Sequence, residues 1–206
     1  MVSFLDQLRA HRLVAIVRGA DADHVAATCR ALLDEGVRLV EVPLTTPGAE
    51  SIIGELAAHA PAGALVGAGT VLEAPQVHEV VAAGAQFIVT PAVTVAINAA
   101  VEAGVPVLAG AYSPTEAWEA HQAGASAVKL FPASAGGPAY LKALRDPFPQ
   151  IPFVPVGGVD VVGAGEYFAA GAVAIGVGGP LVGDAVRGGS LDELRQRARA
   201  FLAAVR

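Results

Sequence analysis

A short pattern recurs along the chain, in which a glycine closes a helix-like segment and stands just before a run of aliphatic residues. Glycine is favoured directly after a helix because it adopts a left-handed backbone conformation at little cost. The pattern occurs at Glu35-Gly36-Val37, Ala83-Gly84-Ala85, Ala103-Gly104-Val105, Ala123-Gly124-Ala125 and Ala170-Gly171-Ala172. Its glycines are 48, 20, 20 and 47 residues apart. Because each long spacing is close to two units of roughly 24 residues, we predict a strand–helix module repeated about eight times.

The aliphatic runs are apolar throughout rather than alternating, which indicates strands buried on both faces of a parallel sheet. The expected strands cover residues 13–17, 39–43, 65–69, 87–90, 105–109, 127–130, 153–156 and 174–177. Segments with helical periodicity lie between them, among them residues 22–33, 49–58, 75–82, 115–122 and 191–205.

Eight such modules fit a closed barrel better than a doubly wound open sheet. An open sheet of this kind has about five to seven strands and a glycine fingerprint, GxGxxG, after the first one. The first expected strand is instead followed by Arg18-Gly19-Ala20. We therefore predict an α/β fold in which residues 1–206 form a single (β/α)8 TIM barrel with an additional short N-terminal helix.

Charge and composition argue against several classes of partner. The net charge of −6 is spread along the chain without a basic patch, so we expect no nucleic-acid partner. No stretch of about 18 apolar residues is free of charge, proline and glycine, so we expect no membrane partner. Residues 1–12 carry charges and lack the apolar stretch of a signal peptide, and the single cysteine, Cys29, cannot form an intramolecular disulfide. We expect a cytoplasmic protein.

Polar residues at the ends of apolar strands are the first candidates for a site, because active sites of (β/α)8 barrels lie at the carboxyl ends of the strands. They are Arg18, Glu41, Thr70, Thr90 and Lys129. Lys129 stands out because the chain has two lysines against eleven arginines. An ammonium group is costly in an apolar strand, which favours a neutral amine able to attack a ketone. The alternative is a structural lysine paired with a carboxylate.

Glu41 lies in a second apolar run, Leu39-Val40-Glu41-Val42-Pro43-Leu44. A carboxylate there is costly unless it is protonated or hydrogen-bonded. Schiff-base chemistry needs a group that relays protons, so we predict Glu41 as the general acid/base. The alternative is a buried structural pair with Lys129 or Arg18.

Two double glycines follow the last two expected strands, Gly157-Gly158 and Gly178-Gly179. Barrels that bind phosphate commonly present backbone N–H groups at these places, so we predict a phosphorylated or other anionic substrate. We predict no metal, because the five histidines lie on helical segments without carboxylates or cysteines at metal-ligand spacing. These histidines are His11, His24, His59, His78 and His121.

Five motifs resemble those of a known family in sequence, order and spacing, and the resemblance covers nearly the whole chain. They are Val40-Glu41-Val42-Pro43-Leu44, Val66-Gly67-Ala68-Gly69-Thr70-Val71-Leu72, Phe87-Ile88-Val89-Thr90-Pro91, Val128-Lys129-Leu130-Phe131-Pro132-Ala133 and Pro155-Val156-Gly157-Gly158-Val159. The family comprises the aldolases of 2-keto-3-deoxy-6-phosphogluconate, 4-hydroxy-2-oxoglutarate and 2-keto-3-deoxy-6-phosphogalactonate.

The resemblance implies reversible cleavage of the phosphogalactonate or phosphogluconate compound to pyruvate and glyceraldehyde 3-phosphate. It implies that Lys129 forms the Schiff base with Glu41 as general acid/base, and that Thr70 and Pro91 hold the pyruvate part while Phe131 packs against it. Arg18 and the glycine loops would hold the anionic ends of the substrate. A homotrimer without a cofactor is also implied.

Two positions depart from the family pattern. Thr45 stands where the gluconate-type members carry arginine, and the galactonate-type members are more similar here. Gly179 stands where the family usually has serine, which removes one hydroxyl contact to phosphate. Two other functions stay open at this point: a sugar-phosphate isomerase or epimerase in which Lys129 is only electrostatic, and a non-catalytic sugar-phosphate binding module.

Overall fold

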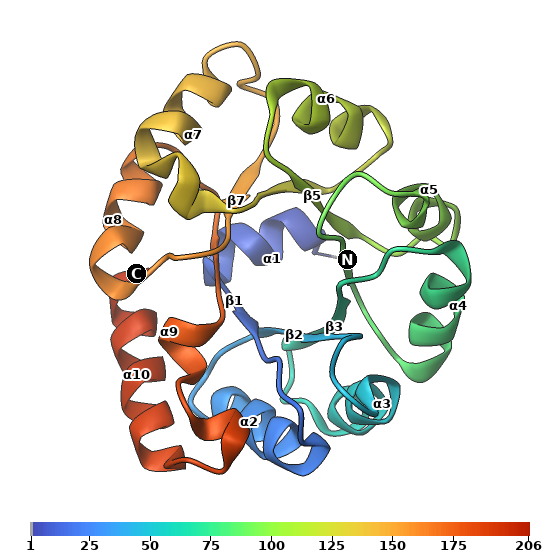
Figure 1. Ribbon diagram of the computed structural model, residues 1–206, viewed down its shortest axis with the longest axis vertical. Helices are drawn as coiled ribbons and strands as arrows, with labels where there is room; N and C mark the ends of the chain where they lie inside the picture. Colours follow the sequence, from blue (N-terminus) through green and yellow to red (C-terminus); the bar gives the residue numbers. More distant parts are fainter. Residues whose placement is uncertain (1) are drawn as a thin grey trace.

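The computed structural model describes residues 2–206 and confirms a parallel barrel with alternating helices (Figure 1). The strands are β1 (Leu13–Ile16), β2 (Leu39–Pro43), β3 (Leu65–Gly69), β4 (Ile88–Val89), β5 (Val107–Ala111), β6 (Ala127–Leu130), β7 (Phe153–Pro155) and β8 (Ile175–Val177). The helices are α1 (Phe4–His11), α2 (Ala22–Asp34), α3 (Ala49–His59), α4 (Ala74–Ala83), α5 (Val95–Glu102), α6 (Pro114–Gln122), α7 (Gly137–Arg145), α8 (Val161–Ala169), α9 (Gly179–Val182) and α10 (Leu191–Ala204), with short 3-10 turns η1 (Ala133–Ala135) and η2 (Ala185–Arg187).

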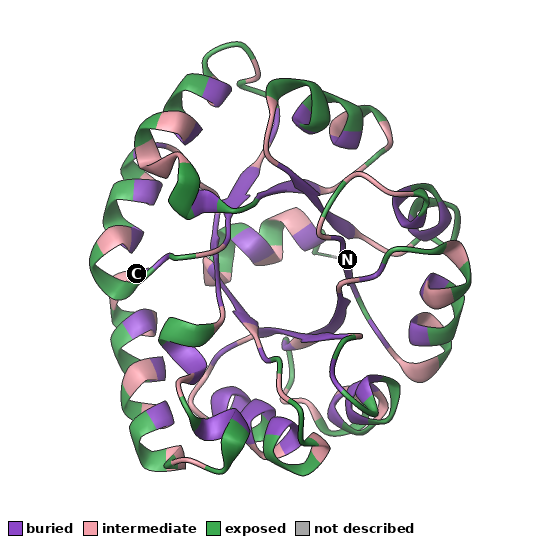
Figure 2. Ribbon diagram, viewed as in Figure 1, coloured by how far each residue is buried: buried purple, intermediate pink, exposed green. Residues whose placement is uncertain are grey.

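The strands pair in parallel in the order β7-β6-β5-β4-β3-β2-β1-β8. A further parallel bridge between Val156 and Gly176 joins the two ends of this order and closes the barrel. Figure 1 shows the strands as a central ring with the helices around it. In Figure 2 this ring is buried, and the helices turn their exposed faces outward.

The predicted helix-end glycines all adopt the left-handed backbone. Their φ angles lie between 70° and 114° at Gly36, Gly84, Gly104, Gly124 and Gly171. The repeat read from the sequence therefore marks true helix ends.

Five strands differ from their predicted bounds. β1 ends at Ile16, β7 ends at Pro155 and β8 begins at Ile175, each one residue short of the prediction. β5 begins at Val107 rather than at residue 105, because the Val105 N–H still bonds the carbonyl of Ala100 in helix α5. Pro106 has no N–H to offer a strand ladder. β4 is reduced to Ile88 and Val89, although the backbone N–H of Thr90 still bonds the Leu108 carbonyl of β5.

Helix α1 fills the end of the barrel where the strands begin. Phe4 and Leu8 belong to the cluster of apolar side chains inside the barrel. The Phe4 ring stacks on Phe87 with 5.0 Å between centroids, and the helix begins at a capping box between Ser3 and Asp6. The interior is thus packed at this end. None of the helices in residues 2–206 combines the length and the apolarity that a bilayer crossing requires.

Candidate active site

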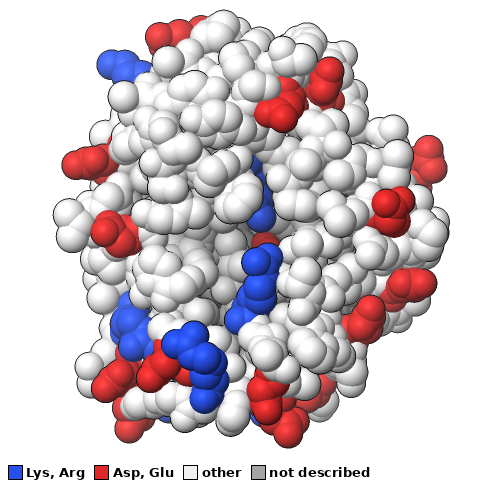
Figure 3. Space-filling view, in the orientation of Figure 1, with Lys and Arg blue, Asp and Glu red and all other residues white. Residues whose placement is uncertain are grey.

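A cavity of about 520 Å³ lies at the carboxyl ends of the strands. Figure 3 shows this face hollowed near its centre, with basic side chains on both sides of the hollow and a small acidic surface between them. The cavity is lined by nine of the residues that the sequence singled out: Arg18, Thr70, Pro91, Lys129, Phe131, Gly157, Gly158, Gly178 and Gly179. The tenth, Glu41, lies buried beside it rather than in its wall.

Glycines at inward-facing strand positions make room for groups that surround this cavity. A Cβ atom at Gly110 of β5 would overlap the carbonyl of Pro91, and one at Gly69 of β3 would overlap the carboxylate of Glu41. Side chains alternate between the two faces of a strand, so any larger residue at these positions would point into the site. The two glycines therefore leave space for the Glu41 carboxylate and for the backbone of Pro91.

Glu41 and Lys129 face each other across the barrel. Leu39 and Ala127 lie in the interior cluster, and Glu41 and Lys129 follow two positions later on the same strands, so alternation points them inward as well. Four strand steps separate β2 from β6 in either direction around the closed barrel. The two side chains are therefore opposed, with only 1% of Glu41 and 7% of Lys129 exposed.

The opposed pair does not form a structural ion pair. Within residues 2–206, no ion pair includes Glu41 or Lys129, and the buried Oε2 of Glu41 has no hydrogen-bond partner. Burial raises the pKa of Glu41 above the ordinary glutamate value, and the positive charges of Lys129 and Arg18 hold that rise back. A carboxyl with a raised pKa and a free oxygen is suited to proton transfer.

Arg18 and Thr70 form a polar contact at the rim of the cavity. The Nη2 group of Arg18 donates to the Thr70 hydroxyl over 3.1 Å. Thr70 has a φ of 56°, a strained conformation for a β-branched residue of the kind that clusters at functional sites. The turn is held by the N–H of Val71 on the Val89 carbonyl and by Gln76, which accepts from Leu72. The fold thus holds Thr70 in place despite its strain.

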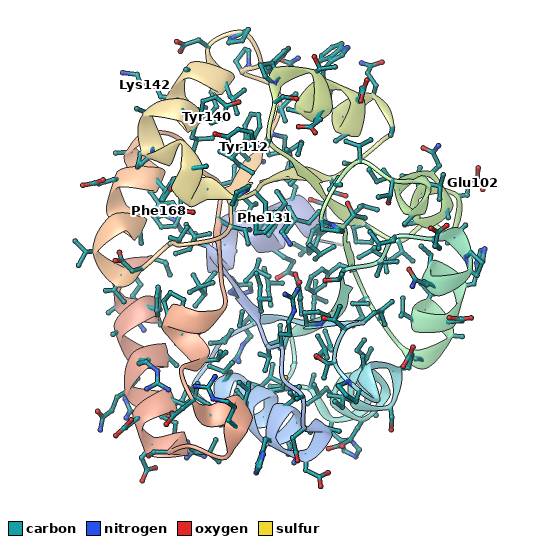
Figure 4. All side chains as sticks on the ribbon, viewed as in Figure 1. Glu102, Tyr112, Phe131, Tyr140, Lys142 and Phe168 are labelled. Atoms are coloured by element: carbon teal, nitrogen blue, oxygen red, sulfur yellow. The ribbon has the colours of Figure 1, made fainter. Side chains whose placement is uncertain are left out.

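Phe131 supplies an apolar wall next to the amine. The Nζ atom of Lys129 lies 5.3 Å from the centroid of the Phe131 ring. Figure 4 shows Phe131 near the centre of the ring of strands, while Lys142 and Glu102 lie on outer helices. The ring is 41% exposed, so it can still cover a bound molecule.

The two glycine loops offer unpaired backbone donors. Across residues 2–206, the N–H groups of Gly158, Gly178 and Gly179 find no acceptor within the chain. Gly157 and Gly158 have φ angles of 95° and 78°, and a Cβ at Gly158 would lie 2.7 Å from that of Ser134. Such N–H groups can hold an anion.

Thr90, the fifth polar residue found at a strand end, has a structural place. Its buried hydroxyl donates to the Ala92 carbonyl over 2.7 Å and accepts from the Gly110 N–H over 3.1 Å. Conversely, Arg187 of η2 lines the cavity although it was not among the predicted site residues. Its one sequence signal is a basic residue before Gly188-Gly189, in the segment after the last strand. No group of three or more histidine, cysteine, aspartate or glutamate side chains placed to hold a metal occurs in the described chain.

A closed (β/α)8 barrel with a buried lysine opposite a buried glutamate at its mouth fits the class of barrel enzymes. The family model described as KDPG and KHG aldolase matches residues 5–196. The chain belongs to this aldolase family.

Individual relatives agree with this assignment. The 2-dehydro-3-deoxy-6-phosphogalactonate aldolase of Escherichia coli (strain K12) is 39% identical over 94% of both chains. A probable 2-dehydro-3-deoxy-6-phosphogalactonate aldolase of Rhizobium meliloti (strain 1021) is 38% identical over 93% of this chain and 90% of its own. A solved KDPG aldolase of Legionella pneumophila, with pyruvate captured as a covalent carbinolamine, has a TM-score of 0.85 at 29% identity and 97% coverage of each chain.

Proposed function

We propose that the chain is a Schiff-base aldolase that reversibly cleaves 2-keto-3-deoxy-6-phosphogalactonate or 2-keto-3-deoxy-6-phosphogluconate to pyruvate and glyceraldehyde 3-phosphate. The observation that carries the proposal is the opposition of Lys129 and Glu41, both buried and unpaired, at the mouth of the barrel. The names of the galactonate-type relatives support the substrate, and the family assignment favours a lyase over a sugar-phosphate isomerase or a binding module.

In the proposed mechanism, the Lys129 amine attacks the C2 ketone to form a carbinolamine, which loses water to give an iminium ion. A base removes the proton of the C4 hydroxyl, the C3–C4 bond breaks, and its electrons move to the iminium to form an enamine. Glyceraldehyde 3-phosphate leaves. The enamine takes a proton at C3, and water hydrolyses the imine to release pyruvate and the free lysine. Glu41 relays these protons, and the carbinolamine captured in the Legionella relative supports the covalent route.

The remaining wall residues would bind the two ends of the substrate. Arg18 and Thr70 would hold the carboxylate end, with Pro91 and Phe131 packed against the pyruvate carbons. The glycine loops would hold the phosphate, with the unpaired N–H groups of Gly158, Gly178 and Gly179 as donors. In this arrangement the Lys129 amine lies between the site for the carboxylate and the site for the phosphate.

Release of pyruvate by the native protein tests the function. Each epimer is supplied separately and pyruvate is measured with a coupled dehydrogenase, so that kcat/KM for the two can be compared. Turnover of at least one epimer is expected. A folded protein that releases pyruvate from neither would overturn the proposal.

We further propose that residues 1–206 act as one cytoplasmic aldolase domain that assembles as a homotrimer and uses no cofactor. Apolar side chains exposed on outer helices, among them Val95, Trp118 and Val162, offer surface that contact with a second subunit would cover. The free thiol of Cys29 is buried in helix α2, which suits a reducing compartment.

Substituting Gly69 with alanine is expected to lower kcat about 100-fold, because the new methyl group takes the place of the Glu41 carboxylate and a displacement of about 1 Å can cost that factor. Steady-state kinetics of aldol cleavage measures it. Gly165→Ala in helix α8 is the matched control, since a Cβ there meets no atom within 4 Å; it should leave kcat unchanged. Equal kcat in the two variants would show that Gly69 does not position Glu41.

Substituting Gly179 with serine is expected to lower KM for the phosphorylated substrate about five-fold, as one added hydrogen bond would. A Cβ at Gly179 meets nothing within 4 Å, so the side chain fits without strain. Gly179→Ala fills the same space without a hydroxyl and should leave KM unchanged. The phosphate is placed elsewhere if serine and alanine give the same KM.

A further inference from the structure

Arg187 reaches the cavity from a rigid backbone but has no assigned role. The two residues before it, Ala185 and Val186, are buried, and Val186 also lines the cavity. The turn is held by the Arg187 N–H on the Asp184 carbonyl over 2.8 Å and by the Gly188 N–H on the Ala185 carbonyl over 3.1 Å. The Arg187 side chain itself is exposed and joins no ion pair within residues 2–206.

At the β8 end of the cavity, Arg187 is the one side chain among the described wall residues whose positive charge can balance that of a phosphate group. The charged side chains in its wall are Arg18, Lys129 and Arg187. Lys129 must be neutral to attack a ketone, and Arg18 bonds Thr70 at the ends of β1 and β3. The segment after β8, which includes Gly178 and Gly179, contributes only backbone donors besides Arg187.

We infer that Arg187 binds the phosphate of the substrate and makes the enzyme select phosphorylated over non-phosphorylated keto-deoxy sugar acids. The inference rests on the proposed function. A guanidinium group binds phosphate oxygens through two parallel hydrogen bonds and adds a positive charge, which backbone N–H groups do not carry. Arg187 thereby takes the place of the hydroxyl that Gly179 lacks.

The effect of Arg187→Gln on two substrates tests the inference. For the phosphorylated substrate, KM should rise about 10- to 100-fold with kcat nearly unchanged, as expected for loss of a charge-assisted hydrogen bond. For the same sugar acid without phosphate, kcat/KM should stay within about two-fold of the native value. Arg187→Lys keeps the charge but not the paired hydrogen bonds, so its KM for the phosphorylated substrate should lie between those of the native protein and of Arg187→Gln.

Arg9→Gln is the matched control, because Arg9 is exposed on helix α1 at the opposite end of the barrel. It removes the same charge and should leave both substrates unaffected. Equal losses on both substrates in Arg187→Gln, or an unchanged KM for the phosphorylated one, would overturn the inference.

Direct binding of inorganic phosphate separates this inference from the proposed function. In a titration followed by phosphorus NMR, the native protein and Arg9→Gln should bind phosphate at least 10-fold more tightly than Arg187→Gln. This outcome supports the role of Arg187 even if the native protein cleaves neither epimer. Equal phosphate affinity in all three proteins counts against Arg187 even if cleavage is observed.

Discussion

Substituting Lys129 with methionine is expected to lower kcat/KM for cleavage by at least ~10⁴-fold, because the covalent pathway that carries most of the acceleration is lost. Methionine is unbranched and apolar, so it suits the buried position and the barrel should still fold. The amine can also be followed directly. Borohydride reduction in the presence of pyruvate should attach one pyruvyl group to the native protein at Lys129 and none to the variant, as read by mass spectrometry of peptides.

Lys142→Met is the matched control, because Lys142 is the other lysine of the chain and lies exposed on helix α7. This variant should keep native activity and take up the pyruvyl group as the native protein does. Cleavage by the native protein without any trapped pyruvyl group would remove the imine mechanism. Lys129 would then act only through its charge.

Substituting Glu41 with glutamine is expected to lower kcat about 10²- to 10⁴-fold, the range that a lost general acid/base gives. The same change should stabilise the fold. The pKa of Glu41 is raised from the ordinary value of 4.5, so its contribution to stability is fully present below that value and is lost as pH rises through the raised pKa. Glutamine does not ionise, and the Tm advantage of the variant should therefore grow from pH 5 to pH 8.

Glu102→Gln provides the comparison for both readouts. Glu102 is exposed at the end of helix α5, so this change should alter neither kcat nor the dependence of Tm on pH. If the Tm difference between Glu41→Gln and the native protein stayed constant with pH, Glu41 would not carry the raised pKa. If kcat survived, another group would relay the protons.

Much of the fold was predictable because its signals are local. Backbone sterics place a glycine after a helix, and the φ angles confirm the predicted helix ends. Burial on both faces makes a strand apolar throughout, and the parallel sheet confirms the predicted strands. The start of β5 was wrong by two residues because Val105 remains bonded to the preceding helix. Burial patterns alone do not reveal such a contact.

The site was predictable to the extent that it follows from strand ends. Arg18, Thr70, Pro91 and Phe131 each lie within two residues of the end of a strand, so closure of the barrel brings them together. Arg187 was missed because its place depends on how the chain folds back after α9. Thr90 shows the opposite case, since a polar residue at a strand end is here bonded to backbone.

Because helix α1 closes one end of the barrel, ligands enter and leave only at the other end. Phe4 and Leu8 occupy the far end, so the sugar acid enters, and both fragments depart, past the same rim. The fragment bonded to the amine cannot move until its bond is hydrolysed, whereas the aldehyde is free as soon as it forms. We therefore expect ordered product release, in which the aldehyde leaves first. The pyruvyl enamine that remains on Lys129 can then react with a different aldehyde that enters the cavity.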